Sequence, residues 1–187
     1  MVNCRSQKGA YEITDASTGF IYSDILNWNN YKLSFDFQIA NWGTNDDGGL
    51  GIIIRANDLA QYGMLQIKRS GIGPHLYING GWKVWQPKDV NMVFDEPVKV
   101  DSWYKCEISC DKSTVNIKIF LKRRRIFDRI WVIPAGVFMF KFDYKDENNK
   151  DQSSYMPFSL TPEYGSIGFR AWGPEKAFIK NVVVKKI

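Results

Sequence analysis

Apolar and polar residues alternate along most of the chain, and a period of two is typical of β-strands with one face in a core and one in water. The segment YKLSFDFQIA, residues 31–40, shows it most clearly. Turn sequences rich in Gly, Asn, Asp and Pro separate the alternating segments, and none carries a helical stripe. The pattern predicts an all-β antiparallel sandwich or barrel, with helix in under about a tenth of its residues. We expect the other strands over residues 19–22, 50–56, 62–69, 75–78, 103–110, 114–121, 137–142, 166–172 and 178–185.

Residues 122–164 break this pattern. An apolar half, IFDRIWVIPAGVFMFKF, is followed by a polar half, DYKDENNKDQSS. We interpret this region as an inserted hairpin or loop. A chain of 187 residues is long enough to form one well-packed domain. The prediction is therefore a single β-sandwich domain, residues 1–187, with an insertion at about residues 122–164.

Two strands far apart in the sequence repeat one motif, GIIIRA at residues 51–56 and SIGFRA at residues 166–171. Successive side chains of a strand point to opposite faces. Strict alternation puts Arg55 and Arg170 on the open faces of their strands, next to small residues, and Trp172 on the same face as Arg170. Each strand thus offers a core face and an open face that could carry a ligand.

Composition and charge limit the classes of binding partner that we expect. Aromatic residues make up 15% of the chain and include seven tryptophans, more than a core usually needs, so we expect some on the surface. The net charge of +5 and the run Lys122–Arg125 raise nucleic acid as a partner, but no other basic cluster extends the run. We interpret it as a solvated turn and expect no nucleic-acid partner.

No apolar run is long enough to span a membrane, and the first residues lack the apolar middle of a signal peptide. We therefore expect no membrane partner. The compartment stays open between the cytoplasm and a secreted or periplasmic location, as does membership of a longer multidomain protein. Cys106 and Cys110 lie about 13 Å apart if they share a strand, too far for a disulfide, so we expect both thiols in the core.

Four blocks follow one another in a characteristic order: YKLSFDFQI, GGLGIIIRANDLAQYGMLQI, DSWYKCEISCDKSTVNIKI and GSIGFRAWGPEKAFIKNVVVKKI. In this order the chain resembles the concanavalin A-like lectin and glucanase superfamily, especially laminin-G-like domains and the bacterial 3-keto-disaccharide hydrolase-type domain. The resemblance covers most of the chain except residues 122–164. The matching positions are Gly51, Ile52, Arg55, Tyr62, Trp103, Tyr104, Ile108, Gly165, Ile167, Gly168, Phe169, Arg170, Phe178, Asn181, Val182 and Val184.

The resemblance implies a jelly-roll sandwich of two curved antiparallel sheets, with the concave sheet often serving as the ligand platform. A sugar is recognised by hydrogen bonds to its hydroxyls and by an aromatic ring against its apolar face. Seven residues lie on the polar faces of strands that the resemblance would place in or near one sheet: Asp36, Gln38, Arg55, Gln66, Lys68, Arg170 and Trp172. Trp82 and Trp85 form a second candidate, and the alternative is that Asp36 and the arginines form surface ion pairs.

Catalytic chemistry has few candidates. The Glu-x-Asp-x-x-Glu strand of retaining glucanases is absent, and the single histidine, His75, excludes multi-histidine metal sites. We interpret His75 as a residue at the edge of a turn. No cofactor is expected, and calcium is the one metal left open, at NDDGG (residues 45–49) or DYKDENNKD (residues 143–151), although both read as ordinary acidic turns.

Three functions therefore stay open. The first is a noncatalytic, lectin-like module that binds an oligosaccharide on the concave sheet face. The second is a glycoside hydrolase that acts on a 3-keto disaccharide, as the hydrolase-type resemblance implies. The third is a protein-interaction domain of the laminin-G-like type.

Overall fold

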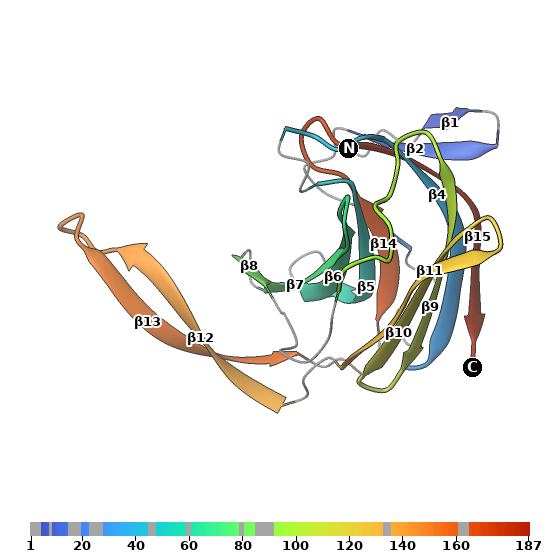
Figure 1. Cartoon of the computed structure of the whole chain (residues 1–187). Coiled ribbons are helices and arrows are strands. Elements are labelled where there is room, and N and C mark those ends of the chain that lie inside the picture. Colours follow the sequence, from blue (N-terminus) through green and yellow to red (C-terminus); the bar gives the residue numbers. More distant parts are fainter. Residues whose placement is uncertain are drawn as a thin grey trace.

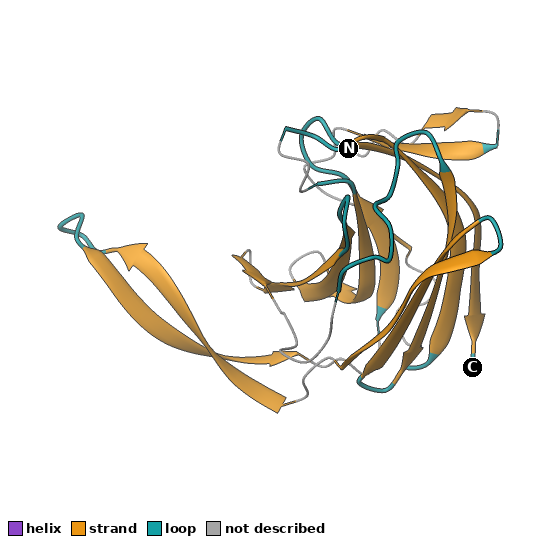
Figure 2. Cartoon of the chain, viewed as in Figure 1, coloured by secondary structure: helices purple, strands orange, loops and turns teal. Residues whose placement is uncertain are grey.

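A computed structural model of the chain describes residues 5–7, 9–14, 20–22, 28–44, 48–58, 61–78, 81–84, 92–132, 136–160 and 165–187. These residues form strands, turns and loops and contain no helix (Figure 2). In this described part, no helix is therefore present that could cross a membrane. The all-β prediction is confirmed.

One sheet has seven antiparallel strands in the order β1-β2-β15-β4-β9-β10-β11 (Figure 1). Its N-terminal strand β2 pairs with its C-terminal strand β15, so two ends of the sequence meet inside one sheet. The register of β4 with β9 is continuous from Tyr31↔Cys110 to Gln38↔Trp103. The strands are β1 (Arg5–Gln7), β2 (Ala10–Thr14), β4 (Tyr31–Asn41), β9 (Trp103–Asp111), β10 (Thr114–Leu121), β11 (Arg124–Val132) and β15 (Lys176–Lys186).

A second sheet has six antiparallel strands in the order β3-β14-β5-β6-β7-β8, and it packs against the first (Figure 1). Its strands are β3 (Phe20–Tyr22), β5 (Leu50–Asp58), β6 (Gln61–Ile67), β7 (Ile72–Ile78), β8 (Gly81–Val84) and β14 (Ser166–Arg170). The two sheets make a jelly-roll sandwich. A separate pair, β12 (Gly136–Lys145) and β13 (Asp151–Leu160), forms a two-stranded sheet that extends away from the sandwich (Figure 1).

One continuous apolar core fills the space between the two sheets. Phe35 on β4 meets Phe169 on β14 edge to face, with ring centroids 4.9 Å apart, which joins the sheets directly. On β4 the buried positions alternate with partly exposed ones, as the sequence pattern predicted. Cys106 and Cys110 are free thiols with 0% exposure, so their expected place in the core is confirmed.

The predicted insertion differs from the structure at its start. Residues 124–132 form β11, which pairs along its length with β10 at the edge of the seven-stranded sheet. Trp131 and Phe127 from this strand lie in the core. Only the β12–β13 hairpin stands apart. An apolar segment next to a basic turn does not reveal whether it extends a sheet or leaves it, which is why the boundary of the insertion was placed too early.

Candidate binding pocket

The outer face of the six-stranded sheet, turned away from the seven-stranded one, carries polar side chains spaced by glycines. One cross-strand row runs Arg170↔Gly51↔Gln66↔Gly73 over β14, β5, β6 and β7. In a pleated sheet, directly opposed side chains point to the same side. Because each polar residue here lies beside a glycine, a hollow opens between the long side chains.

The neighbouring row is more apolar. It runs Gly168↔Ile53↔Met64↔His75 over the same four strands. Ile53 and Met64 belong to a second apolar cluster, separate from the main core, on this outer face. The outer face of the six-stranded sheet therefore combines polar and apolar side chains, which suits a ligand with both kinds of surface.

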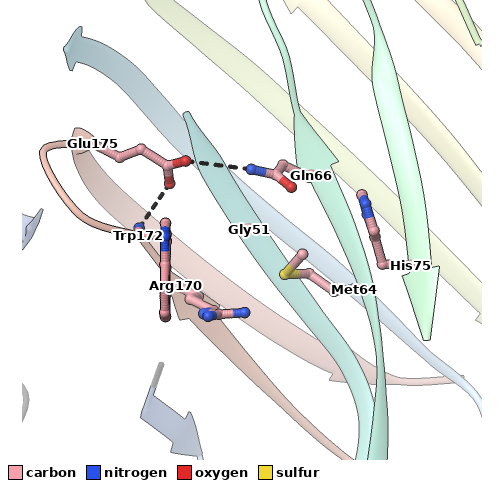
Figure 3. A pocket seen from close by; sticks show the side chains of 7 residues that line it. All are labelled: Gly51, Met64, Gln66, His75, Arg170, Trp172 and Glu175. Carbon is pink, nitrogen blue, oxygen red and sulfur yellow. Dashed lines mark hydrogen bonds between the residues drawn. The ribbon is translucent and has the colours of Figure 1, made fainter. Parts of the chain in front are cut away.

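The pocket has a volume of about 400 Å³ (Figure 3). Three parts of the fold supply its lining: adjacent strands β5 to β7, strand β14, and the loop that joins β14 to β15. Figure 3 shows Glu175 and Gln66 linked across one end and His75 on the far strand. The lining residues are Gly51, Met64, Gln66, His75, Arg170, Trp172 and Glu175.

Glu175 is the most constrained polar group of the pocket, with only 6% of its surface exposed. Its Oε2 accepts a hydrogen bond from the backbone N of Trp172 at 2.8 Å, and its Oε1 accepts one from Gln66 Nε2 at 3.4 Å. A Cβ added at Gly48 would overlap the carboxylate of Glu175. The carboxylate therefore takes this position because the residue at position 48 has no side chain.

Burial raises the pKa of the Glu175 carboxyl, while hydrogen bonds from the backbones of Trp172 and Gly49 and the charge of Arg170 act in the opposite direction. A buried carboxyl with a raised pKa keeps a larger protonated fraction near neutral pH than an exposed glutamate does. Glu175 can therefore act as an acceptor when ionised and as a proton donor when protonated.

Arg170 is 8% exposed, and its guanidinium lies over the ring of Trp172, with 5.0 Å from Cζ to the centroid. It also contacts the Tyr62 hydroxyl, whose pKa is raised by burial and lowered in part by this arginine. Trp172 itself is 58% exposed. A cation behind a solvent-facing indole fixes the ring in place and leaves its other side to a ligand.

His75 lies on β7 at the opposite side of the pocket, and its Nδ1 is 2.8 Å from the carbonyl oxygen of Gly73. Because a carbonyl only accepts, this contact favours the ring form that carries hydrogen on Nδ1, which makes Nε2 the basic nitrogen. Burial lowers the pKa of His75 and the charges of Lys68 and Arg170 lower it further, while the hydrogen bond with the Gly73 carbonyl raises it in part. The lowered pKa favours the neutral ring, whose Nε2 can accept a proton.

The titration of Glu175 gives a first testable prediction. A raised folded-state pKa means that its contribution to stability is fully present below the ordinary glutamate value of about 4.3, and is lost as pH rises through the folded-state value. Glu175→Gln removes this loss. The melting temperature of the variant minus that of the wild type should therefore increase from pH 4 to pH 8, measured by thermal melting at constant ionic strength.

Glu96 provides a control of opposite sign, because its hydrogen bond with Arg124 lowers its pKa. The contribution of Glu96 to folding stability is present above its unfolded-state pKa and is lost as pH falls. The melting temperature of Glu96→Gln minus that of the wild type should therefore not increase with pH. The shift should be small because Glu96 and Arg124 are exposed to solvent. A flat difference curve for Glu175→Gln would contradict the burial of a titrating carboxyl in the pocket.

The structure brings together three of the predicted site residues. Gln66, Arg170 and Trp172 line the pocket. Lys68 follows the end of β6 and lies against Gly73, where an added Cβ would be 2.8 Å from its Cε. Lys68 therefore stands beside His75, at the margin of the pocket.

Arg55 does not lie on the outer face, so its predicted place was wrong. Its φ is 51°, and the pairing of β5 with β6 shifts between Ile54 and Asp58. A bulge of this kind adds one residue and reverses the alternation of faces. Arg55 is consequently 2% exposed and points inward, where its Nη2 donates to the carbonyl of Asn29 at 3.4 Å.

Asp36 and Gln38 do not share a sheet with the pocket either. Both lie on β4 of the seven-stranded sheet, whereas the pocket belongs to the six-stranded one. Asp36 Oδ2 accepts a hydrogen bond from Asn181 Nδ2 at 2.7 Å. Alternation identifies the polar face of a strand but not the sheet that contains it, and the polar faces of two packed sheets point in opposite directions.

The tryptophan pair is only partly described. Trp82 lies on edge strand β8, opposite Tyr77 of β7, and its side chain is outside the described part. Trp85 lies outside the described residues altogether. Their role in ligand binding stays a prediction.

Sequence reasoning missed Glu175 and underestimated His75. Glu175 follows a Gly-Pro turn, and its partners Gly48 and Gly49 lie more than a hundred residues earlier. The two adjacent glycines of NDDGG were the one available signal, since they permit the close approach of another side chain. His75 shares its outer face with Gly73 and Tyr77, and alternation along β7 could have placed it there.

Within the described residues, no group of three or more His, Cys, Asp or Glu side chains gathers to hold a metal ion. One of the two acidic turns considered for calcium is partly described. There Asp146 Oδ1 accepts hydrogen bonds from the backbones of Asn148 and Lys150, at 2.9 and 3.0 Å. Residues 45–47 of the other turn lie outside the described part.

The two-sheet jelly roll with this pocket on its outer face is a concanavalin A-like β-sandwich domain. Residues 4–185 match the family described as the 3-keto-alpha-glucoside-1,2-lyase-like domain, and the chain belongs to that family. No curated protein matched the sequence.

Solved structures with the same fold come from several kinds of protein. The carbohydrate-binding module CBM66 from Bacillus subtilis is 16% identical, with 97% of this chain and 84% of that chain covered and a TM-score of 0.52. The exoplasmic/lumenal domain of VIP36, in its Ca²⁺/Man3GlcNAc-bound form, is 9% identical, with 100% of this chain and 84% of that chain covered and a TM-score of 0.54. A xylan β-1,4-xylosidase from Bacillus halodurans C-125 is 7% identical, with 96% of this chain and 33% of that chain covered and a TM-score of 0.54. At these identities the likeness concerns the fold.

Proposed function

We propose that this domain binds a neutral oligosaccharide in the outer-face pocket. The observation that carries the proposal is the solvent-facing ring of Trp172, fixed over Arg170 at one end of a hollow that glycines open between polar side chains. An aromatic ring suits the apolar face of a pyranose, and Arg170, Gln66 and Glu175 suit its hydroxyls. Two structural neighbours whose names refer to a carbohydrate-binding module and a glycan complex support the choice of ligand class.

The expected affinity is weak. The pocket is open, and a disaccharide gains at most about 7 kcal/mol at about 0.3 kcal/mol per heavy atom, which corresponds to a micromolar to millimolar Kd. A glycan array followed by calorimetric titration of the best neutral oligosaccharide tests binding. An array without any bound neutral glycan would contradict the proposal.

Trp172→Ala is the most direct mutational test. Since the ring is mostly exposed, its removal should lower the melting temperature by only about one or two degrees. Affinity for the best neutral oligosaccharide should fall about tenfold, as expected for the loss of about 1.4 kcal/mol of stacking. Tyr144→Ala removes another exposed ring, on the β12–β13 hairpin, and should leave the affinity unchanged. Equal affinities in the two variants would exclude Trp172 as a platform.

A second candidate function is catalytic elimination on a 3-keto-glycoside, favoured by an imidazole, His75, and a buried carboxyl with a raised pKa, Glu175, on the lining of one pocket. The family description supports the same substrate class. A ketone at C3 acidifies the hydrogen on C2. His75 Nε2 would take this proton, the electron pair would form the C1–C2 double bond, and the C1–O bond would break as Glu175 protonates the leaving oxygen.

Elimination fits this pocket better than the glycoside hydrolysis considered from the sequence. Retaining hydrolysis needs two carboxyls about 5 Å apart, and the described lining contains one, Glu175.

Incubation with methyl 3-keto-α-glucoside should release methanol and a conjugated enone visible by ultraviolet absorbance, with a slower rate for substrate deuterated at C2. His75→Gln should abolish this product without weakening the binding of neutral oligosaccharides as strongly as Trp172→Ala does. Binding without enone formation would leave the domain a noncatalytic module. The protein-interaction alternative stays a prediction.

A further inference from the structure

A second hollow lies on the opposite side of the molecule, on the outer face of the seven-stranded sheet. Its volume is about 620 Å³, within the range of about 300 to 1,000 Å³ that is usual for ligand sites. One cross-strand row in it runs Lys185↔Lys32↔Ser109↔Asn116 over β15, β4, β9 and β10. Four strands at about 4.8 Å spacing give the row a length of about 14 Å.

The next row runs Val183↔Ser34↔Glu107↔Lys118 over the same strands. On the two central strands, each serine lies opposite a longer charged side chain: Ser109 opposite Lys32, and Ser34 opposite Glu107. The groove therefore has hydroxyls on its floor, with Lys185 on one outer strand and Lys118 on the other. We call it the lysine groove, formed by Lys32, Ser34, Glu107, Ser109, Asn116, Lys118 and Lys185.

The charges of the lysine groove are unbalanced along its first row. Lys32 and Lys185 are direct cross-strand partners, and like charges in this position repel each other. None of the described ion pairs involves these two lysines or Lys118. The carboxylate of Glu107, in the second row, contacts Lys105 at 2.5 Å. An anion between Lys32 and Lys185 would relieve their repulsion.

Asn116 supplies an independent indication of a ligand. Its Oδ1 is buried and has no hydrogen-bond partner in the structure. A buried acceptor without a donor is unfavourable, and the hydroxyl of a ligand on the floor of the groove could supply the donor. The groove therefore calls for a ligand with both negative charge and hydroxyl groups.

We propose that the lysine groove is a second binding site, independent of the outer-face pocket of the other sheet, and that it takes an acidic oligosaccharide whose carboxylates or sulfates lie between Lys32 and Lys185. Serine hydroxyls and Asn116 bind the sugar hydroxyls. Glu107 accepts a hydrogen bond from a sugar hydroxyl that lies away from the charged groups.

The same groove disfavours a nucleic acid. Duplex DNA carries a negative charge for about every 1.7 Å of its axis. Glu107 lies inside the groove, and Asp128 is the next residue in the second row, opposite Lys118. Both carboxylates would repel a ligand of such dense charge, whereas an acidic saccharide is less densely charged and can place hydroxyl groups beside them.

The test uses the whole chain and four probes: tetragalacturonic acid, its methyl-esterified form, a sulfated chondroitin tetrasaccharide and a twelve-base-pair DNA. Calorimetric titration at low and moderate salt should show binding of one or both acidic saccharides, weaker as salt rises. The esterified form should bind at least tenfold more weakly than the acid. The two acidic probes separate carboxylate from sulfate recognition.

Lys32→Gln/Lys185→Gln should reduce binding of the acidic probe at least tenfold and remove most of its salt dependence. The matched control Lys99→Gln/Lys186→Gln removes two exposed lysines outside the groove, at the same net charge, and should bind like the wild type. Trp172→Ala should also leave the binding of the acidic probe unchanged. This result would distinguish the lysine groove from the outer-face pocket of the six-stranded sheet. Because a repelling pair is removed, the melting temperature of the groove variant should not fall at low salt.

Four results would overturn the proposal. They are equal binding of the esterified and acidic probes, equal loss in the two double-lysine variants, DNA binding tighter than that of both acidic saccharides, and no detectable binding of either acidic saccharide at millimolar concentration.

Discussion

Replacing Trp131 with alanine is expected to lower the free energy of unfolding by about 3–5 kcal/mol. Its side chain is fully buried, with 0% exposure, and lies opposite Val115 in the edge pair of the seven-stranded sheet. Removing it leaves a cavity that the strands around it cannot fill without moving. Urea denaturation followed by circular dichroism measures the change.

Trp131→Phe is the matched control. The indole Nε1 is buried without a hydrogen-bond partner in the structure, so phenylalanine removes an unsatisfied donor while keeping an aromatic ring. We expect this variant to lose less than about 1.5 kcal/mol. If Trp131→Ala unfolded at the same urea concentration as the wild type, β11 would not be part of the core.

Arg170→Gln is expected to weaken binding of the best neutral oligosaccharide by about 10 to 150-fold, which corresponds to about 1.5–3 kcal/mol for lost charge-assisted hydrogen bonds. This variant should also melt at a lower temperature, because Arg170 is largely buried and contacts both Trp172 and Tyr62. Calorimetric titration and thermal melting on the same preparation measure the two effects.

Tyr62→Phe separates these contributions. It removes the hydroxyl that contacts Arg170, but Tyr62 does not line the pocket. The variant should therefore lose some thermal stability while its affinity stays within about twofold of the wild type. A folded Arg170→Gln protein that binds the oligosaccharide with full affinity would exclude this arginine from the site.

Much of the fold could be predicted because strand alternation is a local property. Residues 31–40 alternate strictly, and the structure buries the residues at the predicted positions of β4. Arg55 shows the limit of the same reasoning. A single residue with positive φ changed the faces of Arg55 and of Ala56 after it in β5, and arginine carries no sequence signal for that conformation.

The pocket was only partly predictable for a different reason. Gln66, Arg170 and Trp172 lie on regular alternating positions of strands or just beyond them, so alternation identified their face. Glu175 reaches the pocket through contacts with residues around position 48, which only the folded chain brings near. Asp36 was grouped with the site because alternation alone does not assign a strand to one of two sheets.

The last two strands of this chain both occupy interior places in their sheets. β15 lies between β2 and β4, and β14 lies between β3 and β5. As the polypeptide leaves the ribosome, β4 and β5 therefore each present an open edge until residues 166–186 have been made. Closure depends on contacts of high sequence separation, which makes folding slow. A nascent or truncated chain that lacks these strands would expose two unpaired strand edges. Chaperone binding and aggregation therefore compete with folding most strongly before these strands have been synthesised.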